Sequence, residues 1–368
     1  MRFSDLVHIP SSLKQLAEMA DDDRLPHANL LQAPAGTGGL PAALALASYL
    51  LCENRTGGDS CGECKACRKS YQWVHPDLHF AFPTVGTRVT SDTFLKEWRA
   101  ALKDQSYQEI NDWLQRIGAE NKQGNLNKEE CVAIAKKLSL KIYEGRYKIM
   151  LIWLPEYLGN EGNRLLKLIE EPPERTVFLL VTQRPERILN TILSRCQLTK
   201  LGRPNEEHLL DWLVRKGMSQ DAAERAARLS GGNVNRALRL GKTEQGGHEK
   251  RFLEWMRVCH SGSPTKLVAW NDEFSKLGRE NQKEFLAYAL HYWREFMRLA
   301  VGATPAEGLS LGPAEVQTAQ KMTAVVSLSQ LQEIVAETEG MIEHVERNAH
   351  PKILAMKVGL KLHEIMRN

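Results

Sequence analysis

The 368-residue sequence lacks several features that would assign it to a specialised class of protein. It has no run of about 18 consecutive apolar residues, so we expect no membrane-spanning helix and no membrane partner. The N-terminal stretch MRFSDLVHIPSSLKQLAEM lacks the apolar core and small-residue cleavage site of a secretory signal. The formal net charge is only +4, which permits contact with nucleic acid but does not indicate it. The length favours two or three globular domains.

The seven cysteines are too unevenly placed for a disulfide scaffold, which favours a reducing, cytoplasmic setting. Four of them form a C-x8-C-x2-C-x2-C array, namely Cys52, Cys61, Cys64 and Cys67. Four thiolates suit a tetrahedral structural zinc ion, and the glycines between them supply the turns of a knuckle. An iron–sulfur cluster, a redox role and chance clustering remain as alternatives. Because all four ligands would be sulfur, we expect a metal that stabilises the fold rather than a catalytic one.

The first 200 residues alternate apolar strands with helical patterns, which predicts a doubly wound α/β domain. Strands are predicted at 28–33, 77–82, 147–154 and 176–182, and helices from Pro41 to about Cys52 and over 159–171, the latter ended by Pro172 and Pro173. We interpret residues from about 85 to 137 as an insertion of amphipathic helices. The pattern is helical after residue 202, which gives domains at 1–202, 203–242 and 243–368.

The stretch APAGTGGL (33–40) follows the first strand and opens the first helix, as a phosphate-binding loop does. Its Gly36, Gly38 and Gly39 preserve the bend of the G-x-x-x-x-G-K-[ST] motif. Gly39 stands where the motif has Lys, and Leu40 stands where it has the Mg²⁺-binding hydroxyl.

The strand within the stretch KIMLIWLPE (148–156) also lacks the acidic end that would hold magnesium. It ends in Trp153 and Leu154, and Glu156 comes too late in the sequence. We therefore expect neither ATP binding nor ATP hydrolysis by this chain.

Several motifs occur together in one order: RLPHANLLQAPAGTGG, the cysteine array, HPDLHF, LLKLIEEPP and RILNTILSRCQ. This combination resembles the clamp-loader ATPase family of bacterial DNA polymerase III, a branch of the AAA+ proteins. The resemblance covers about residues 24–82 and 140–240, and within the family it is to members whose phosphate loop has degenerated. It implies an AAA+ α/β domain with a zinc knuckle, a small helical lid domain and a C-terminal all-helical collar. The insertion at 85–137 departs from the family pattern.

The resemblance also implies partners and residue roles. The family assembles as five protomers, so the partners would be gamma/tau motor subunits and a delta subunit, which together load a sliding clamp onto primer–template DNA. Arg195 in Ser194-Arg195-Cys196 matches the arginine that reaches a neighbouring subunit's ATP. Cys52, Cys61, Cys64 and Cys67 match the zinc knuckle, Thr182 matches a phosphate-sensing polar residue, and Asn235 stands where the family often has Arg.

Two alternatives remain from other classes. An ATP-hydrolysing motor subunit of the same family would need the groups that Gly39 and Leu40 lack. A zinc-ribbon nucleic-acid-binding protein would bind DNA alone with a steep salt dependence.

Overall fold

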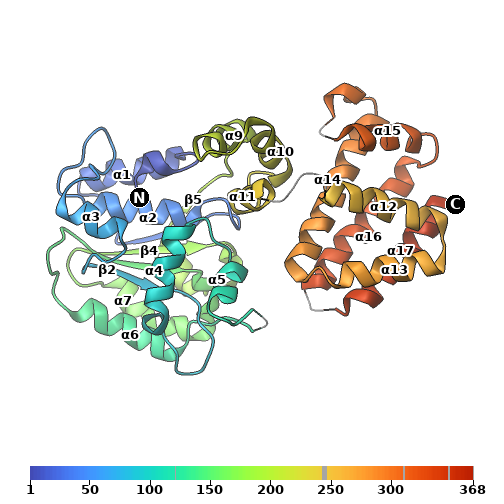
Figure 1. Ribbon diagram of the computed structural model, residues 1–368. Helices are drawn as coiled ribbons and strands as arrows, with labels where there is room; N and C mark the ends of the chain where they lie inside the picture. The colour runs from blue at the N-terminus through green and yellow to red at the C-terminus, as the bar shows by residue number, and fades with distance from the viewer. Residues whose placement is uncertain (121, 243–246, 310, 347–348, 368) are drawn as a thin grey trace. The chain divides into compact units, whose positions relative to one another are not determined.

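The computed structural model describes residues 1–120, 122–242, 247–309, 311–346 and 349–367, and these form two compact units, Met1–Gly241 and Lys242–Asn368. Figure 1 shows strands only in the first unit and a group of helices in the second. Among the described residues, no helix combines the length and the hydropathy needed to cross a bilayer.

The first unit is built on a parallel sheet whose described strands lie in the order β2-β3-β4-β1-β5. The strands are β1 (Ala28–Gln32), β2 (Leu78–Ala81), β3 (Lys148–Trp153), β4 (Thr176–Thr182) and β5 (Gln197–Lys200). β1 therefore lies between β4 and β5, although β4 follows it by more than a hundred residues. The predicted α/β class is confirmed, and β5 is a strand that the sequence pattern did not predict.

Both faces of the sheet are covered, because successive strand residues point to opposite sides. On β1, Leu31 packs into one apolar cluster and Leu30 into the other. The Leu31 side is covered by α1 (Ser11–Asp21), α2 (Gly39–Leu51) and α4 (Leu95–Asp104), and the Leu30 side by α6 (Lys128–Ser139), α7 (Leu166–Glu170) and α8 (Asn190–Leu193). This sandwich of helices around the sheet is what makes every residue of β3 and β4 buried.

The segment predicted as an insertion contributes to both covering layers. It contains η2 (Ser91–Phe94), α4, α5 (Ile110–Arg116) and most of α6. Trp98 of α4 and Trp113 of α5 are fully buried and meet edge to face at a ring-centroid distance of 5.1 Å. Trp98 also stacks on Phe82, directly after β2, at 4.2 Å. The segment thus supplies part of the core beside β2 and β3.

Three other stretches complete the first unit. The 3-10 helix η3 (Pro155–Tyr157) follows β3, and the 3-10 helix η4 (Gly159–Leu165) then runs into α7, where one continuous helix was predicted over 159–171. A further 3-10 helix, η5 (Pro185–Arg187), follows β4. The cysteine segment is followed by α3 (Lys65–Tyr71), and η1 (Phe3–Asp5) lies near the N-terminus. The predicted lid region contains α9 (Glu206–Arg215), α10 (Gln220–Ser230) and α11 (Val234–Lys242), whose apolar cluster includes Tyr107.

The second unit is helical throughout its described residues. Its elements are α12 (Gly247–Ser261), α13 (Pro264–Ser275), α14 (Arg279–Ala300), η6 (Ala306–Gly308), α15 (Pro313–Met322), α16 (Leu328–Glu346) and α17 (Pro351–Arg367). Its interior is rich in aromatic rings, with Trp255 stacked on Trp270 at 5.5 Å and Phe252 against Tyr292 at 4.4 Å. The predicted C-terminal helical region is confirmed.

Candidate phosphate loop, metal centre and finger arginine

The glycine-rich loop connects β1 to α2, as the sequence predicts, and its backbone requires glycine at two positions. Gly36 has φ +68° and Gly38, the N-cap of α2, has φ +123°, both in the region that L side chains avoid. A Cβ added at Gly36 would lie 2.2 Å from Oδ1 of Asn233. Gly39 is equally confined, because its Cβ would lie 2.8 Å from the Cβ of Ala33 and 3.1 Å from Cγ1 of Val181. The bend of a phosphate loop is present, but the position of its lysine has no room for a side chain.

The space above the loop is filled by the protein itself. Tyr107, from the segment between α4 and α5, lies so close that a Cβ on Gly38 would be 3.0 Å from its ring. Its hydroxyl accepts a 3.0 Å hydrogen bond from the Val7 amide, and its ring meets Trp212 of α9 edge to face. Two cavities border the loop and Tyr107, with volumes of about 20 and 10 Å³, each the room of about one water molecule. Little open space therefore remains beside the loop glycines in this conformation.

The N-terminal end of α11 is bonded to the loop. The amides of Val234 and Asn235 donate to the Gly36 carbonyl at 2.9 and 3.3 Å, so donors of this helix end are used within the chain. Asn233, directly before α11, donates through Nδ2 to Glu109 at 2.8 Å. These bonds attach the lid region to the loop.

A second pair of contacts joins α11 to α5. Asn235 donates through Nδ2 to Asp112 at 2.5 Å, and Arg239 forms an ion pair with the same carboxylate at 3.6 Å. Asn235, which stands where the family often has a nucleotide-contacting Arg, is thus committed to a contact inside the chain.

The carboxyl ends of β3 and β4 carry no free carboxylate toward the loop. Trp153 is buried, and Leu154, at φ +59°, turns the chain away into η3. The Glu156 carboxylate accepts from the Thr182 hydroxyl at 2.9 Å and from the Gln183 amide at 3.0 Å. Burial raises the pKa of Glu156, while these donors act in the opposite direction. The hydroxyl of Thr182, the residue that matches a phosphate-sensing position, is therefore hydrogen-bonded to Glu156, a contact that sequence reasoning missed.

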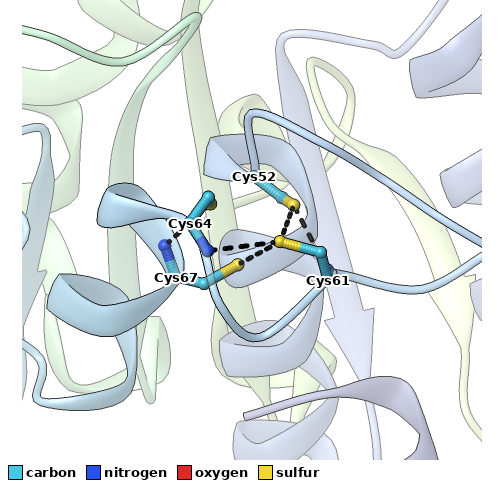
Figure 2. A group of neighbouring side chains, drawn as sticks. All are labelled: Cys52, Cys61, Cys64 and Cys67. Atoms are coloured by element: carbon cyan, nitrogen blue, oxygen red, sulfur yellow. Dashed lines mark hydrogen bonds between the residues drawn. The ribbon is translucent and has the colours of Figure 1, made fainter.

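The four clustered cysteines converge, as the sequence predicts. Cys52 is the C-cap of α2, Cys64 is the N-cap of α3, Cys67 lies in the first turn of α3, and Cys61 lies in the loop between the two helices. All four sulfurs lie within 4.8 Å of one another (Figure 2). The Sγ–Sγ distances are 3.6 Å for Cys52–Cys61 and 3.9 Å for Cys61–Cys67.

This geometry fits a metal ion. Sulfurs at about 2.3 Å from a tetrahedral zinc lie roughly 3.8 Å from one another, which matches the two measured separations. Amides of the knuckle point at the sulfurs, from Cys61 to Cys52 at 3.3 Å and from Cys64 to Cys61 at 3.4 Å. Amide donors lower the pKa of the Cys61 thiol to about 6, whereas burial raises the pKa of Cys52. The four cysteines can therefore hold a metal ion such as zinc.

The knuckle also holds the N-terminal segment. The Asp59 carboxylate accepts from the amides of Phe3 and Ser4 at 2.9 and 3.1 Å, and Arg2 donates to the Cys61 carbonyl at 2.7 Å. Phe3 is itself part of the core cluster around α2. The cysteine cluster is thus joined to the sheet domain both through α2 and through the N-terminal segment.

Arg195 lies just after α8, in a turn that the core holds in place. Ile192, one turn before it, is buried, and the Arg195 amide donates to the Ile192 carbonyl at 3.0 Å. Its Nε donates to Glu170 at 2.9 Å, and its Nη1 donates to the Thr191 carbonyl at 3.0 Å and lies 3.5 Å from the Ser194 hydroxyl. The side chain is 33% exposed, and none of its recorded contacts is with the loop of its own chain. The guanidinium is therefore partly exposed and is held by contacts from α7 and from its own turn.

The fold and these sites define a class: an AAA+ domain with a degenerate phosphate loop, a cysteine knuckle and a helical C-terminal unit. The family described as "DNA polymerase III, delta subunit" matches residues 9–205, more than half of the chain, and the chain belongs to that family.

Curated relatives agree with this assignment. The chain is 32% identical over 216 residues to DNA polymerase III subunit delta′ of Escherichia coli, covering 58% of this chain and 54% of that one. It is 25% identical to subunit delta′ of Bacillus subtilis, covering 80% and 78% of the two chains, and 27% identical to subunit tau/gamma of Haemophilus influenzae, covering 65% and 30%. The match thus spans about half the length of the Escherichia coli relative.

Proposed function

We propose that this chain is a delta-prime-type clamp-loader subunit that does not hydrolyse ATP itself and instead completes the ATP site of a neighbouring motor subunit. The complex would load a sliding clamp onto primer–template DNA during replication. Membership in the delta-subunit family and the similarity to delta′ proteins support the clamp-loader assignment.

The observation that carries the non-hydrolysing role is the closed loop. The side chains of Asn233 and Tyr107 lie directly against Gly36 and Gly38, and the cavities beside the loop have volumes of only about 20 and 10 Å³. Phosphoryl transfer requires a lysine, a magnesium-binding hydroxyl and an acidic strand end, and Gly39, Leu40 and Leu154 stand in their places. The same three replacements disfavour a motor function for this chain.

Arg195 would act in trans. A guanidinium placed at a neighbour's ATP can neutralise the charge that develops on the transferred phosphoryl group, an effect worth about 10³–10⁵ in rate for arginine fingers generally. Its partial exposure and its bonds to Thr191 and Glu170 leave it accessible yet held.

The partners of this role are gamma/tau motor subunits and a delta subunit, with the helical second unit as the collar that joins them. Similarity to a tau/gamma protein supports a common architecture for the neighbours. The four cysteines would hold one structural Zn²⁺, as their sulfur-only ligand set suggests.

The test is Arg195→Ala in a loader reconstituted from this chain, motor subunits and delta. We expect an intact complex with lower DNA-stimulated ATP hydrolysis and slower clamp loading, because one ATP site loses its finger. Arg164→Ala is the matched control, since Arg164 also pairs through Nε with a glutamate of its own domain, Glu161 at 2.6 Å. Unchanged hydrolysis and loading with Arg195→Ala would refute the finger role.

A further inference from the structure

The side chain that holds Arg195 is a carboxylate from another element. Glu170 is the last residue of α7, and its Oε2 accepts from Nε of Arg195 at 2.9 Å. No other contact is recorded for the Glu170 side chain among the described residues. The nearby chain is stiff, because Pro172 and Pro173 follow within three residues.

The core brings these two elements together. Ile169, next to Glu170, and Ile192, three residues before Arg195, are both fully or almost fully buried in the same apolar cluster, together with Ile188. A Cβ on Gly162 of η4 would lie 2.9 Å from Cδ1 of Ile192, so η4 and α8 pack closely here. The shared apolar cluster thus anchors the two elements that carry Glu170 and Arg195, whose side chains meet at the surface, 55% and 33% exposed.

The guanidinium is only partly used. It offers five N–H groups: one on Nε, two on Nη1 and two on Nη2. Glu170 takes Nε, and Thr191 and Ser194 lie within reach of Nη1, whereas no contact to Nη2 is recorded within the described part of the chain. The contacts thus fix the plane of the group and leave one nitrogen for an anion outside the chain.

We propose that Glu170 is a positioning residue that orients Arg195 toward the phosphoryl group at the neighbouring ATP site. This inference rests on the proposed finger role of Arg195. Without the carboxylate, the side chain of Arg195, with its four rotatable bonds, samples more rotamers. The loss of pre-orientation raises the activation free energy of ATP hydrolysis.

The test is single-turnover ATP hydrolysis by the reconstituted loader with DNA, comparing wild type, Arg195→Ala, Glu170→Ala and the double variant. The kinetic phase of ATP hydrolysis that is present in wild type and absent in Arg195→Ala gives the Arg195-dependent rate. We expect Glu170→Ala to lower that rate about two- to fivefold, the scale of one partly exposed ion pair, with the ATP concentration at half-saturation unchanged. In the Arg195→Ala background, Glu170→Ala should have no further effect.

Two variants separate positioning from a general structural effect. Glu170→Gln keeps an oxygen that accepts from Nε, so it should retain more than half of the rate. Glu171→Ala removes the adjacent exposed carboxylate, for which no contact with Arg195 is recorded, and should leave the rate unchanged.

The outcomes distinguish the two proposals. If Arg195→Ala has no effect, the finger role fails. If Arg195→Ala lowers ATP hydrolysis but Glu170→Ala leaves it unchanged or raises it, the positioning role fails while the finger role stands. The same holds if Glu170→Ala lowers hydrolysis further in the Arg195→Ala background.

Discussion

Restoring the chemical groups of the phosphate loop should not restore nucleotide binding. The perturbation is the double variant Gly39→Lys/Leu40→Thr, which rebuilds the G-K-[ST] part of the motif. If the loop had lost only its side chains, this change would return a site for Mg-ATP. The structure indicates that neighbouring side chains crowd the loop as well: Ala33 and Val181 lie against position 39, and Tyr107 and Asn233 lie against the other loop glycines.

The cost follows from two distances. The Cβ of residue 39 would lie 2.8 Å from the Cβ of Ala33 and 3.1 Å from Cγ1 of Val181, which is 3% exposed. Neither contact atom is the end of a flexible side chain, so backbone must move. Overpacking of this kind costs about 1–3 kcal/mol of unfolding free energy, and each kcal/mol lowers the melting temperature by about 2–4 °C in a unit of this size.

The assays are thermal unfolding and titration with a fluorescent ATP analogue in the presence of Mg²⁺. We expect a lower melting temperature and no saturable binding. Gly202→Lys is the matched control, because a Cβ there meets nothing within 4 Å and its stability should be unchanged. Saturable micromolar binding by the double variant at wild-type stability would refute the closed-loop argument.

Three further predictions concern Arg195, the cysteine cluster and His79, a residue of β2. Arg195→Ala should lower DNA-stimulated ATP hydrolysis of the reconstituted loader while Arg164→Ala does not, as measured by phosphate release. The purified chain should contain about one zinc ion by elemental analysis. Cys67→Ser should remove the zinc and lower the melting temperature, whereas Cys196→Ser, outside the cluster, should leave the metal in place. A metal-free wild-type chain would exclude the zinc site. Burial lowers the pKa of His79 from 6.5 to about 4, so the neutral imidazole stabilises the fold above pH 6.5. As the pH falls from 6.5 toward 4 this contribution is lost, and the free energy of unfolding decreases by up to about 1.4 kcal/mol per pH unit. Denaturant unfolding at pH 7 and pH 4.5 should show a smaller loss for His79→Gln than for wild type, and equal losses would contradict the assignment.

The sequence predicted the features that depend on neighbouring residues. Cys61, Cys64 and Cys67 are three residues apart, a spacing that brings neighbouring sulfurs close together, so the convergence of the cysteines was predictable. The identity of the metal as zinc stays a prediction. The long apolar runs gave β3 and β4 because both their faces are buried. β5 was missed because only one of its four residues is buried, as at the edge of a sheet. The helix predicted over 159–171 is largely 3-10, since Gly159 and Gly162 weaken an α-helix there.

What escaped prediction depends on residues distant in the sequence. The amphipathic pattern of 95–116 indicated helices but not that Trp98 and Trp113 would pack against Phe82. Nothing in the loop motif indicates that Tyr107 would cover it, or that Asn233 would lie against Gly36. The pairing of Glu170 with Arg195 likewise requires α7 and α8 to share one apolar cluster, which only the folded chain reveals.

Helix α2 connects the glycine-rich loop to the cysteine cluster. It begins at Gly39, on the glycine loop, and its C-cap is Cys52, a sulfur of the knuckle, with every residue between them buried. Oxidation of the cysteines would therefore not merely loosen a peripheral appendage. We expect it to release the C-terminal end of α2, the helix on which much of the apolar core packs, so the redox state of the four thiols affects the stability of the whole sheet domain.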